Sequence, residues 1–226
     1  MSYNLLRLTG DLAAAVAVVR SAAPEVLAVQ EPPRAPWGRA KLRRFARAAG
    51  LELVLAGRGA RTTALLAAPS VLPAKEVQVL RLRWWGSRLV RRWWARRGVV
   101  LARIGGLRVL VVHLALDEAE RVRHAHEIIA RLDDSPTVLL GDLNERPGAP
   151  VWQAFAARLR DADPEGPPTF PARDPRHRID AVLVSEGVTV RHVEVLDGPE
   201  VRAASDHLPL VADLELGARP GRATPA

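Results

Sequence analysis

Apolar and polar residues follow one another along the chain in blocks whose spacing predicts short helices and short strands. Apolar positions at helical spacing, such as Trp37, Leu42 and Phe45, predict a helix over residues 37–49 that ends at Gly50. Asp11 is a suitable N-cap for a helix over residues 12–22, and further helices are predicted over residues 117–132 and 150–159. Short apolar runs predict strands over residues 3–8, 26–29, 51–56, 63–67, 99–104, 107–113, 138–141, 177–184, 188–196 and 208–216.

The order of these elements predicts an α/β (α+β) fold. Gly105 and Gly106 separate two strand-like runs and predict a tight hairpin, whereas other strands are separated by helices. Hairpins together with strand–helix–strand units favour layered, mixed sheets over a purely parallel sheet. No linker divides the 226 residues, so we expect one domain over residues 1–216 and a flexible tail over residues 217–226.

The absence of cysteine restricts the kind of metal site that the chain can build. With no cysteine, disulfides and thiolate ligands are excluded, and a metal would be held by carboxylate, amide or imidazole groups. Such ligands suit hard cations, so Mg²⁺ or Mn²⁺ is the expected cofactor.

The charge of the chain favours an anionic partner. The formal net charge is +8, and almost all the basic residues are arginine, whose planar side chain matches phosphate oxygens. A preference for arginine codons in a GC-rich genome would explain the same composition. No apolar run reaches the length of a membrane span, and residues 12–19 are too short and follow Asp11 too closely for a signal peptide. We therefore expect a cytoplasmic monomer.

Polar and ionisable residues stand where apolar strands end. Glu31, His113 and Asp142 each follow such a run, and Asp206 and His207 precede the last one. Singly, each could be a helix cap, a turn residue or a hydrogen-bonded core residue. Together they would converge on one rim of the sheets, where α/β proteins usually bind ligands.

The residues of these motifs and their order along the chain resemble those of the endonuclease/exonuclease/phosphatase superfamily. This superfamily includes deoxyribonuclease I, abasic-site endonucleases, neutral sphingomyelinases and inositol polyphosphate 5-phosphatases. The resemblance spans nearly the whole chain, from residue 3 to residue 216. It is carried by GDLN at residues 141–144, RID at 178–180, SDHLP at 205–209, VQE at 29–31 and VHL at 112–114. It implies a four-layer sandwich of two mixed β-sheets flanked by helices.

The resemblance also implies which residues hold the metal. Glu31 would be the principal ligand, with Asn4 beside it on the neighbouring strand. Asp206 would support a metal or orient His207. One carboxylate and several waters suit Mg²⁺, which also accepts a phosphate oxygen of the substrate.

The remaining motif residues would act on the reacting phosphate. Asp142 would position or deprotonate the attacking water, and Asn144 would hold a phosphate oxygen or the aspartate. His113 would donate to a non-bridging oxygen, and Asp180 would orient His207. Either Asp142 or His207 could be the base, and two coupled groups would share the titration.

Several arginines are candidates for substrate binding. The strand near residues 61–66 offers no acidic partner for His113, so Arg58 or Arg61 could supply the phosphate contact, and Arg178 of the RID motif is a further candidate. The segment from Arg81 to Arg97 (RLRWWGSRLVRRWWARR) holds seven arginines and four tryptophans. It could bind nucleic acid, rest on anionic lipid, or form a surface insertion.

The sequence thus predicts metal-dependent hydrolysis of a phosphate ester by in-line attack of water. A phosphodiesterase or nuclease acting on nucleic acid is the favoured reading of charge and of the arginine/tryptophan segment. A phosphatase or lipid-headgroup phosphodiesterase is one alternative. A non-catalytic binding protein that retains the fold is the other.

Overall fold

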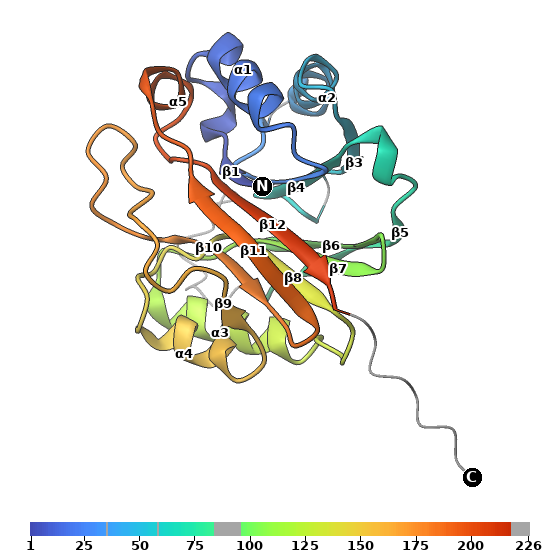
Figure 1. The fold of residues 1–226 in the computed structure, drawn as a ribbon, viewed down its shortest axis with the longest axis vertical. Helices are drawn as coiled ribbons and strands as arrows, with labels where there is room; N and C mark the ends of the chain where they lie inside the picture. Colours follow the sequence, from blue (N-terminus) through green and yellow to red (C-terminus); the bar gives the residue numbers. More distant parts are fainter. Residues whose placement is uncertain (35, 58, 84–95, 218–226) are drawn as a thin grey trace.

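Two six-stranded β-sheets pack face to face, and helices cover both outer faces of the pair (Figure 1). The computed structural model describes residues 1–34, 36–57, 59–83 and 96–217. Arg58, residues 84–95 of the arginine/tryptophan segment and residues 218–226 of the predicted tail therefore lie outside the described residues. The arrangement confirms the predicted four-layer α/β sandwich.

Both sheets are mixed, and each contains one parallel pair of strands. In the first sheet β1 and β2 are parallel, and in the second β7 and β8 are parallel, while the other neighbours are antiparallel. The first sheet has the order β11 (Val188–Val195), β12 (Leu210–Leu216), β1 (Ser2–Asn4), β2 (Val26–Gln30), β4 (Thr63–Ala67), β3 (Glu52–Leu55). The second has the order β5 (Lys75–Arg81), β6 (Gly98–Ile104), β7 (Leu107–His113), β8 (Thr137–Asp142), β10 (Asp180–Val184), β9 (Arg160–Asp161).

Successive side chains along each strand point to opposite faces of the sheet and so pack into two different core layers. On β7, Val109 and Val111 pack into the core between the sheets, whereas Leu110 and Val112 pack under helices on the outer face. The outer face of the second sheet carries α3 (Glu118–Ile129) and α4 (Pro150–Ala156), and that of the first carries α1 (Leu12–Ala22), α2 (Gly38–Ala48) and α5 (Pro199–Ala204) (Figure 1). None of the described helices is long and apolar enough to cross a membrane.

The predicted helices are present, and Asp11 caps α1 by accepting hydrogen bonds from the backbone of Ala13 and Ala14. The structure also contains elements that the pattern did not predict, namely β5, β9 and α5. Strand β5 is mostly exposed and carries polar residues, and β9 and α5 are very short, so none of them has a strong apolar period.

Two predicted strands are shorter than expected. The strand predicted over residues 3–8 ends at Asn4 and is followed by a 3₁₀ turn, η1 (Leu6–Leu8). Its apolar residues continue past the strand because Leu5 and Leu8 are buried in the core under the helices. The strand predicted over residues 177–184 begins only at Asp180.

A buried side-chain hydrogen bond ties the two sheets together. The hydroxyl of Thr63 on β4 donates to the backbone carbonyl of Gly98 on β6 over 2.8 Å. A Cβ atom at Gly98 would lie 2.0 Å from the carbonyl oxygen of Gly59, so only glycine allows this close approach. The contact lies at the ends of strands that lead to the site described below.

Replacing the buried hydroxyl should therefore weaken the packing of the sheets. Thr63→Val keeps the shape of the side chain but leaves the Gly98 carbonyl without this donor, which should cost about 1–3 kcal/mol of unfolding free energy. Thermal unfolding should show a lower Tm, by about 2–4 °C for each kcal/mol. Thr189→Val on the outer strand β11 is the matched control. Equal stability of the two variants would contradict the role given to Thr63.

Candidate active site

The carboxylate of Asp142 is the centre of a buried polar cluster at the end of β8. Its Oδ2 atom lies 3.4 Å from Asn4 Nδ2, 3.5 Å from His113 Nε2 and 3.8 Å from His207 Nε2. Its Oδ1 atom accepts a hydrogen bond from the backbone of Asn144 over 2.8 Å. All of these residues except the half-buried Asn144 are almost fully buried.

Strand pairing within the second sheet positions His113 and Asp180 beside Asp142. Parallel pairing of β7 with β8 sets His113 beside Asp142, and antiparallel pairing of β8 with β10 sets Asp180 on its other side. Gly141 has a φ of +148°, and a Cβ there would lie 2.0 Å from the Val112 carbonyl oxygen. The glycine of the GDLN motif thus lets β7 and β8 meet directly before the aspartate.

The other sheet contributes Asn4 and the loop that carries His207. Asn4 ends β1 opposite Gln30 on β2, and Glu31 follows Gln30. The hydroxyl of Ser205 donates to the Asn4 carbonyl over 2.6 Å, which ties the SDHLP loop to the first strand. The site is therefore shared between the two sheets.

His207 is held in one orientation by Asp180. The Nδ1 atom of His207 lies 2.8 Å from Asp180 Oδ2, and the hydroxyl of Thr169 donates to the same oxygen over 2.6 Å. The ring of Phe170 packs against the imidazole at a centroid distance of 4.7 Å. Burial lowers the pKa of His207, but the carboxylate of Asp180 outweighs it and the pKa rises to about 9. The imidazole is therefore a cation at neutral pH.

Asp142 and His113 have shifted pKa values for different reasons. Burial and the nearby Asp180 carboxylate raise the pKa of Asp142 to about 7, although His207 opposes the shift. Burial, together with the charges of Arg97 and His207, holds the pKa of His113 well below its usual range. His113 is therefore uncharged at neutral pH. The pKa of Asp142 lies near neutral pH, so its carboxylate can accept a proton there.

The donor set fits a hard divalent cation. Ligand atoms of Asp142, Asp180 and His207 lie within 4.8 Å of one another, and the two carboxylates are buried next to each other. A cation near them would offset the repulsion between the two carboxylates, whose oxygens suit Mg²⁺ or Mn²⁺, whereas His207 could be a ligand only after losing its proton. Two of the predicted metal ligands, Glu31 and Asp206, lie outside this triad.

These two carboxylates have other partners in the structure. Glu31 is 23% exposed and pairs with Arg7, with 3.3 Å between Arg7 Nε and Glu31 Oε2. Asp206 is half-buried, and its Oδ1 atom lies 3.5 Å from the hydroxyl of Ser205. The side chain of Asn144 donates to the Leu114 carbonyl over 2.9 Å, so it is Asn144's backbone that contacts Asp142.

Of the predicted substrate-binding arginines that the structure describes, Arg61 precedes a strand of the first sheet and Arg178 precedes a strand of the second. Arg178 is buried, its guanidinium donates to both carboxylate oxygens of Asp161 over 2.8 Å, and it lies 5.0 Å from the centre of the Trp152 ring. Arg178 therefore stabilises β9 through Asp161, and its role in substrate binding stays a prediction. Arg61 is half-buried before β4, and Arg58 is outside the described residues.

Two further arginines, Arg34 and Arg97, lie near the site, and neither belongs to a motif that carries the resemblance. Burial lowers the pKa of Arg97, an effect that Asp142 and Glu31 oppose and Arg34 strengthens. Burial also lowers the pKa of Arg34, which Glu31 opposes and Arg7 and Arg61 strengthen. The Nε atom of Arg97 is buried and makes no hydrogen bond within the described part of the chain. Arg34 follows the end of β2, and Arg97 directly precedes β6. These positions next to strands are the sequence signal that could have identified them.

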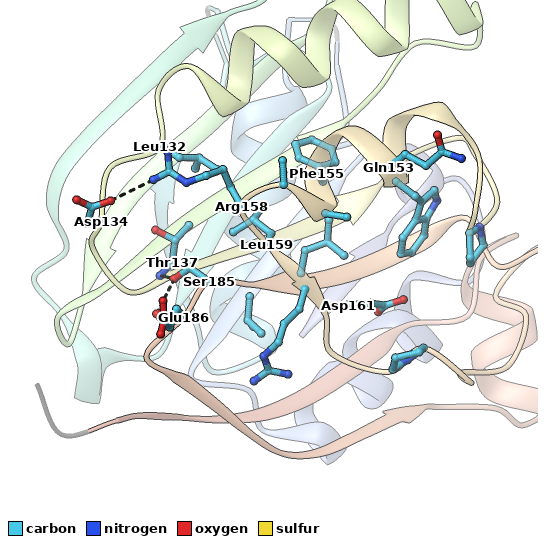
Figure 2. A pocket seen from close by; sticks show the side chains of 18 of the residues that line it. Leu132, Asp134, Thr137, Gln153, Phe155, Arg158, Leu159, Asp161, Ser185 and Glu186 are labelled. Carbon is cyan, nitrogen blue, oxygen red and sulfur yellow. Dashed lines mark hydrogen bonds and ion pairs between the residues drawn. The ribbon is translucent and has the colours of Figure 1, made fainter. Parts of the chain in front are cut away.

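A cavity of about 900 Å³ lies elsewhere, between α4, β9 and the end of β10 (Figure 2). Its walls include Phe155, Leu159, Asp161, Ser185 and Glu186. None of the predicted site residues lines it. The chemistry of the chain is therefore concentrated at the strand ends around Asp142 rather than in this cavity.

Comparison with known proteins agrees with the fold and with the family that the sequence resembles. A family model described as "Endonuclease/Exonuclease/phosphatase family" matches residues 1–207. No curated protein matches the chain.

Solved structures share the fold at low sequence identity. An endonuclease/exonuclease/phosphatase from Bacteroides vulgatus has a TM-score of 0.73 at 18% identity, covering 89% of this chain and 90% of that one. A mannosyl-6-phosphatase from Bacteroides thetaiotaomicron has a TM-score of 0.69 at 18% identity, covering 95% and 98%. An AP endonuclease from Archaeoglobus fulgidus has a TM-score of 0.70 at 17% identity, also covering 95% and 98%.

The match over residues 1–207 includes every strand end that builds the Asp142 cluster. The two mixed sheets, the shared site and the family model lead to the same conclusion: the chain belongs to the endonuclease/exonuclease/phosphatase family, whose members hydrolyse phosphoester bonds.

Proposed function

We propose that the chain is a divalent-metal-dependent hydrolase that cleaves phosphodiesters of nucleic acid. The observation that carries the proposal is the surroundings of Asp142 Oδ2, where donors from both sheets meet one buried carboxylate oxygen. A carboxylate with a pKa near 7, beside one cationic and one neutral imidazole, is a combination suited to moving a proton near neutral pH.

In this proposal Asp142 is the base. As the water oxygen attacks phosphorus, the bond from phosphorus to the leaving oxygen breaks on the opposite side, and the water proton passes to Asp142 Oδ2. His207 is already protonated at neutral pH, so it stabilises the negative charge on the phosphoryl oxygens or gives its proton to the leaving oxygen. Neutral His113 donates a hydrogen bond to a non-bridging oxygen. Asp180 acts as a positioning residue through His207.

Following the family resemblance, we assign Mg²⁺ or Mn²⁺ to Glu31 and Asn4, and the carboxylate of Asp142, which Asn4 contacts, would add negative charge beside the cation rather than act as its principal ligand. The bound cation would supply charge neutralisation at the phosphoryl group. Asn4 links Glu31 to the Asp142 cluster because it pairs with Gln30, the residue before Glu31, and its side chain donates to Asp142 Oδ2.

Charge favours nucleic acid as the substrate. The net charge is +8, and Arg34, Arg61 and Arg97 gather near Glu31 and Asp142, where they would attract a polyanion. A phosphatase acting on a phosphomonoester is the second candidate, because the mannosyl-6-phosphatase has the same fold over almost the full length of both chains. A lipid-headgroup diester and a non-catalytic binding role are outcomes that the first experiment below separates.

A substrate panel with Mg²⁺ or Mn²⁺ tests the proposal. Plasmid, abasic duplex and single-stranded DNA should be cleaved, and excess EDTA should abolish cleavage until the cation is restored, because the carboxylates need the cation to bind phosphate. Release of phosphate from mannose 6-phosphate without cleavage of DNA would favour the phosphatase. Cleavage of sphingomyelin alone would favour the lipid diesterase, and binding of DNA without hydrolysis of any ester would favour the binding protein.

Asp142→Asn tests the proposed base. The amide keeps the shape of the side chain but cannot accept the water proton, so kcat for bis-nitrophenyl phosphate should fall by about a thousandfold. Asp134→Asn, at a fully exposed aspartate paired with Arg158, is the matched control and should keep full activity. Retention of more than a tenth of the activity by Asp142→Asn would exclude Asp142 as the base.

The pH dependence of stability provides a test that needs no substrate. The raised pKa of Asp142, about 7 against 3.8, means that its contribution to stability is lost as pH rises between these values. The raised pKa of His207 means that its contribution is complete below pH 6.5 and is lost as pH rises through about 9. In EDTA, Tm should therefore fall by several degrees between pH 6 and pH 9.

The Met1 amino group must be separated from this effect. Burial lowers its pKa from 8.0 to about 5, so its contribution increases stability as pH rises over this range. The informative comparison is thus between the wild-type chain and Asp142→Asn, which keeps Met1 and should show a shallower fall in Tm. Added Mg²⁺ should raise Tm more at pH 8 than at pH 6, because ionised Asp142 adds negative charge beside the cation that Glu31 and Asn4 would hold. Identical slopes for the two proteins would contradict the assigned titration.

A further inference from the structure

The turn after β1 holds consecutive residues in the left-handed region of backbone conformation. Leu6, Arg7 and Leu8 have φ values of 44°, 57° and 55°, and none of them is glycine. Side chains other than glycine's disfavour this region by about 1–2 kcal/mol per residue. A run of such residues persists only where surrounding contacts hold it, and such runs are typical of functional sites.

The contacts that hold the turn come from the site itself. The side chain of Asn4 accepts a hydrogen bond from the Leu6 backbone over 3.1 Å. The backbone N–H of Arg7 donates to the Glu31 carbonyl over 2.8 Å, and Leu8 is buried in the core under the helices. The turn is thus bound to Asn4 and Glu31, the residues to which the proposed function assigns the metal.

This geometry brings the Arg7 side chain to the carboxylate of Glu31. Arg7 Nε lies 3.3 Å from Glu31 Oε2, and the two side chains are 55% and 23% exposed. Glu31 is itself left-handed, with a φ of 47°, and its N–H donates to the Thr62 carbonyl over 3.0 Å. Backbone bonds on both sides therefore fix the position at which the cation of Arg7 meets the anion of Glu31.

A guanidinium and a divalent cation compete for such a carboxylate. Both are positively charged, so their simultaneous binding to one carboxylate brings like charges within a few ångströms of each other. Arg34, whose pKa Arg7 and Arg61 both lower, already contributes positive charge to the same surroundings. Arrival of a divalent cation at Glu31 would therefore drive the exposed end of Arg7 away, while the backbone bond to Glu31 keeps it close.

We infer that Arg7 is a built-in counter-ion of Glu31 that a divalent cation displaces, and that the displaced guanidinium binds an oxygen of the phosphate substrate. The inference rests on the proposed function, in which Glu31 holds the cation. Arg7 would thus weaken metal binding and strengthen anion binding. It would also make the cation bind before the phosphate does.

Calorimetric titration with Mg²⁺ alone, and then with inorganic phosphate at saturating Mg²⁺, tests both halves of the inference. In Arg7→Gln the Kd for Mg²⁺ should fall by about two- to fivefold, because a partly exposed ion pair no longer competes. The Kd for phosphate should rise by about tenfold, because a charge-assisted hydrogen bond is lost. A merely structural role of Arg7 would not move the two constants in opposite directions.

Two further variants keep the test interpretable. Arg7→Gly should give the same two shifts while suiting the φ of 57°, so it serves if the glutamine variant folds poorly. Arg20→Gln, at an exposed position in the last turn of α1, removes the same charge and should leave both constants unchanged.

The outcomes separate this inference from the proposed function. If the wild-type chain does not bind Mg²⁺, or if Glu31→Gln binds it as tightly, the metal site of the proposed function is wrong. If Mg²⁺ binds through Glu31 but Arg7→Gln and Arg7→Gly bind it equally or more weakly, only the role of Arg7 is wrong. Unchanged phosphate binding in both variants would overturn the second half of the inference.

Discussion

The carboxylate of Asp142 is the constraint on which the rest of the site depends. A buried carboxylate is costly unless hydrogen-bond donors or cations compensate it, and Asp142 also has Asp180 as a neighbour of like charge. Compensation comes from Asn4 in one sheet, from His113 in the other, and from His207 in the loop before the last strand. The two sheets must therefore pack in one relative position for this charge to be tolerated.

The polar cluster and the apolar core contribute differently to the packing of the two sheets. Apolar side chains such as Val109 and Val111 fill the space between the sheets, and their burial favours packing without specifying which polar groups meet. Directional contacts at one end, including the hydrogen bond from the Thr63 hydroxyl to the Gly98 carbonyl, favour one relative position of the two sheets. The site is thus part of what determines how the layers fit, besides being the region where the chemistry is concentrated.

Apolar periods predicted the layered fold, and the motifs that resemble the endonuclease/exonuclease/phosphatase superfamily predicted the residues that meet around Asp142. Apolar periods mark the strands, and motifs such as GDLN place polar residues at strand ends. The register that sets His113 and Asp180 on either side of Asp142 depends on pairing between distant strands, which no local pattern encodes. The ion pair of Arg178 with Asp161 could not be predicted either, because an arginine in the RID motif gives the same sequence signal whether it faces a ligand or a neighbouring strand.

The early end of β1 was missed for a related reason. Leu5 and Leu8 continue the apolar run of a strand, but the side chain of Asn4 bonds to the Leu6 backbone and turns the chain. A polar residue that bonds to its own backbone overrides the apolar pattern, and only tertiary contacts with Glu31 make that outcome favourable.

The hydrogen bond from Ser205 to the Asn4 carbonyl joins residues that are 201 positions apart. A ribosome releases the first of these long before the second exists, so the nascent chain carries β1 for most of its synthesis without the loop that completes the site. Contacts of such long range form late and slowly, since they must close a large loop first. A nascent chain that lacks residues 205–207 therefore cannot assemble the full Asp142 cluster, because His207 and the hydroxyl that binds the Asn4 carbonyl are both missing.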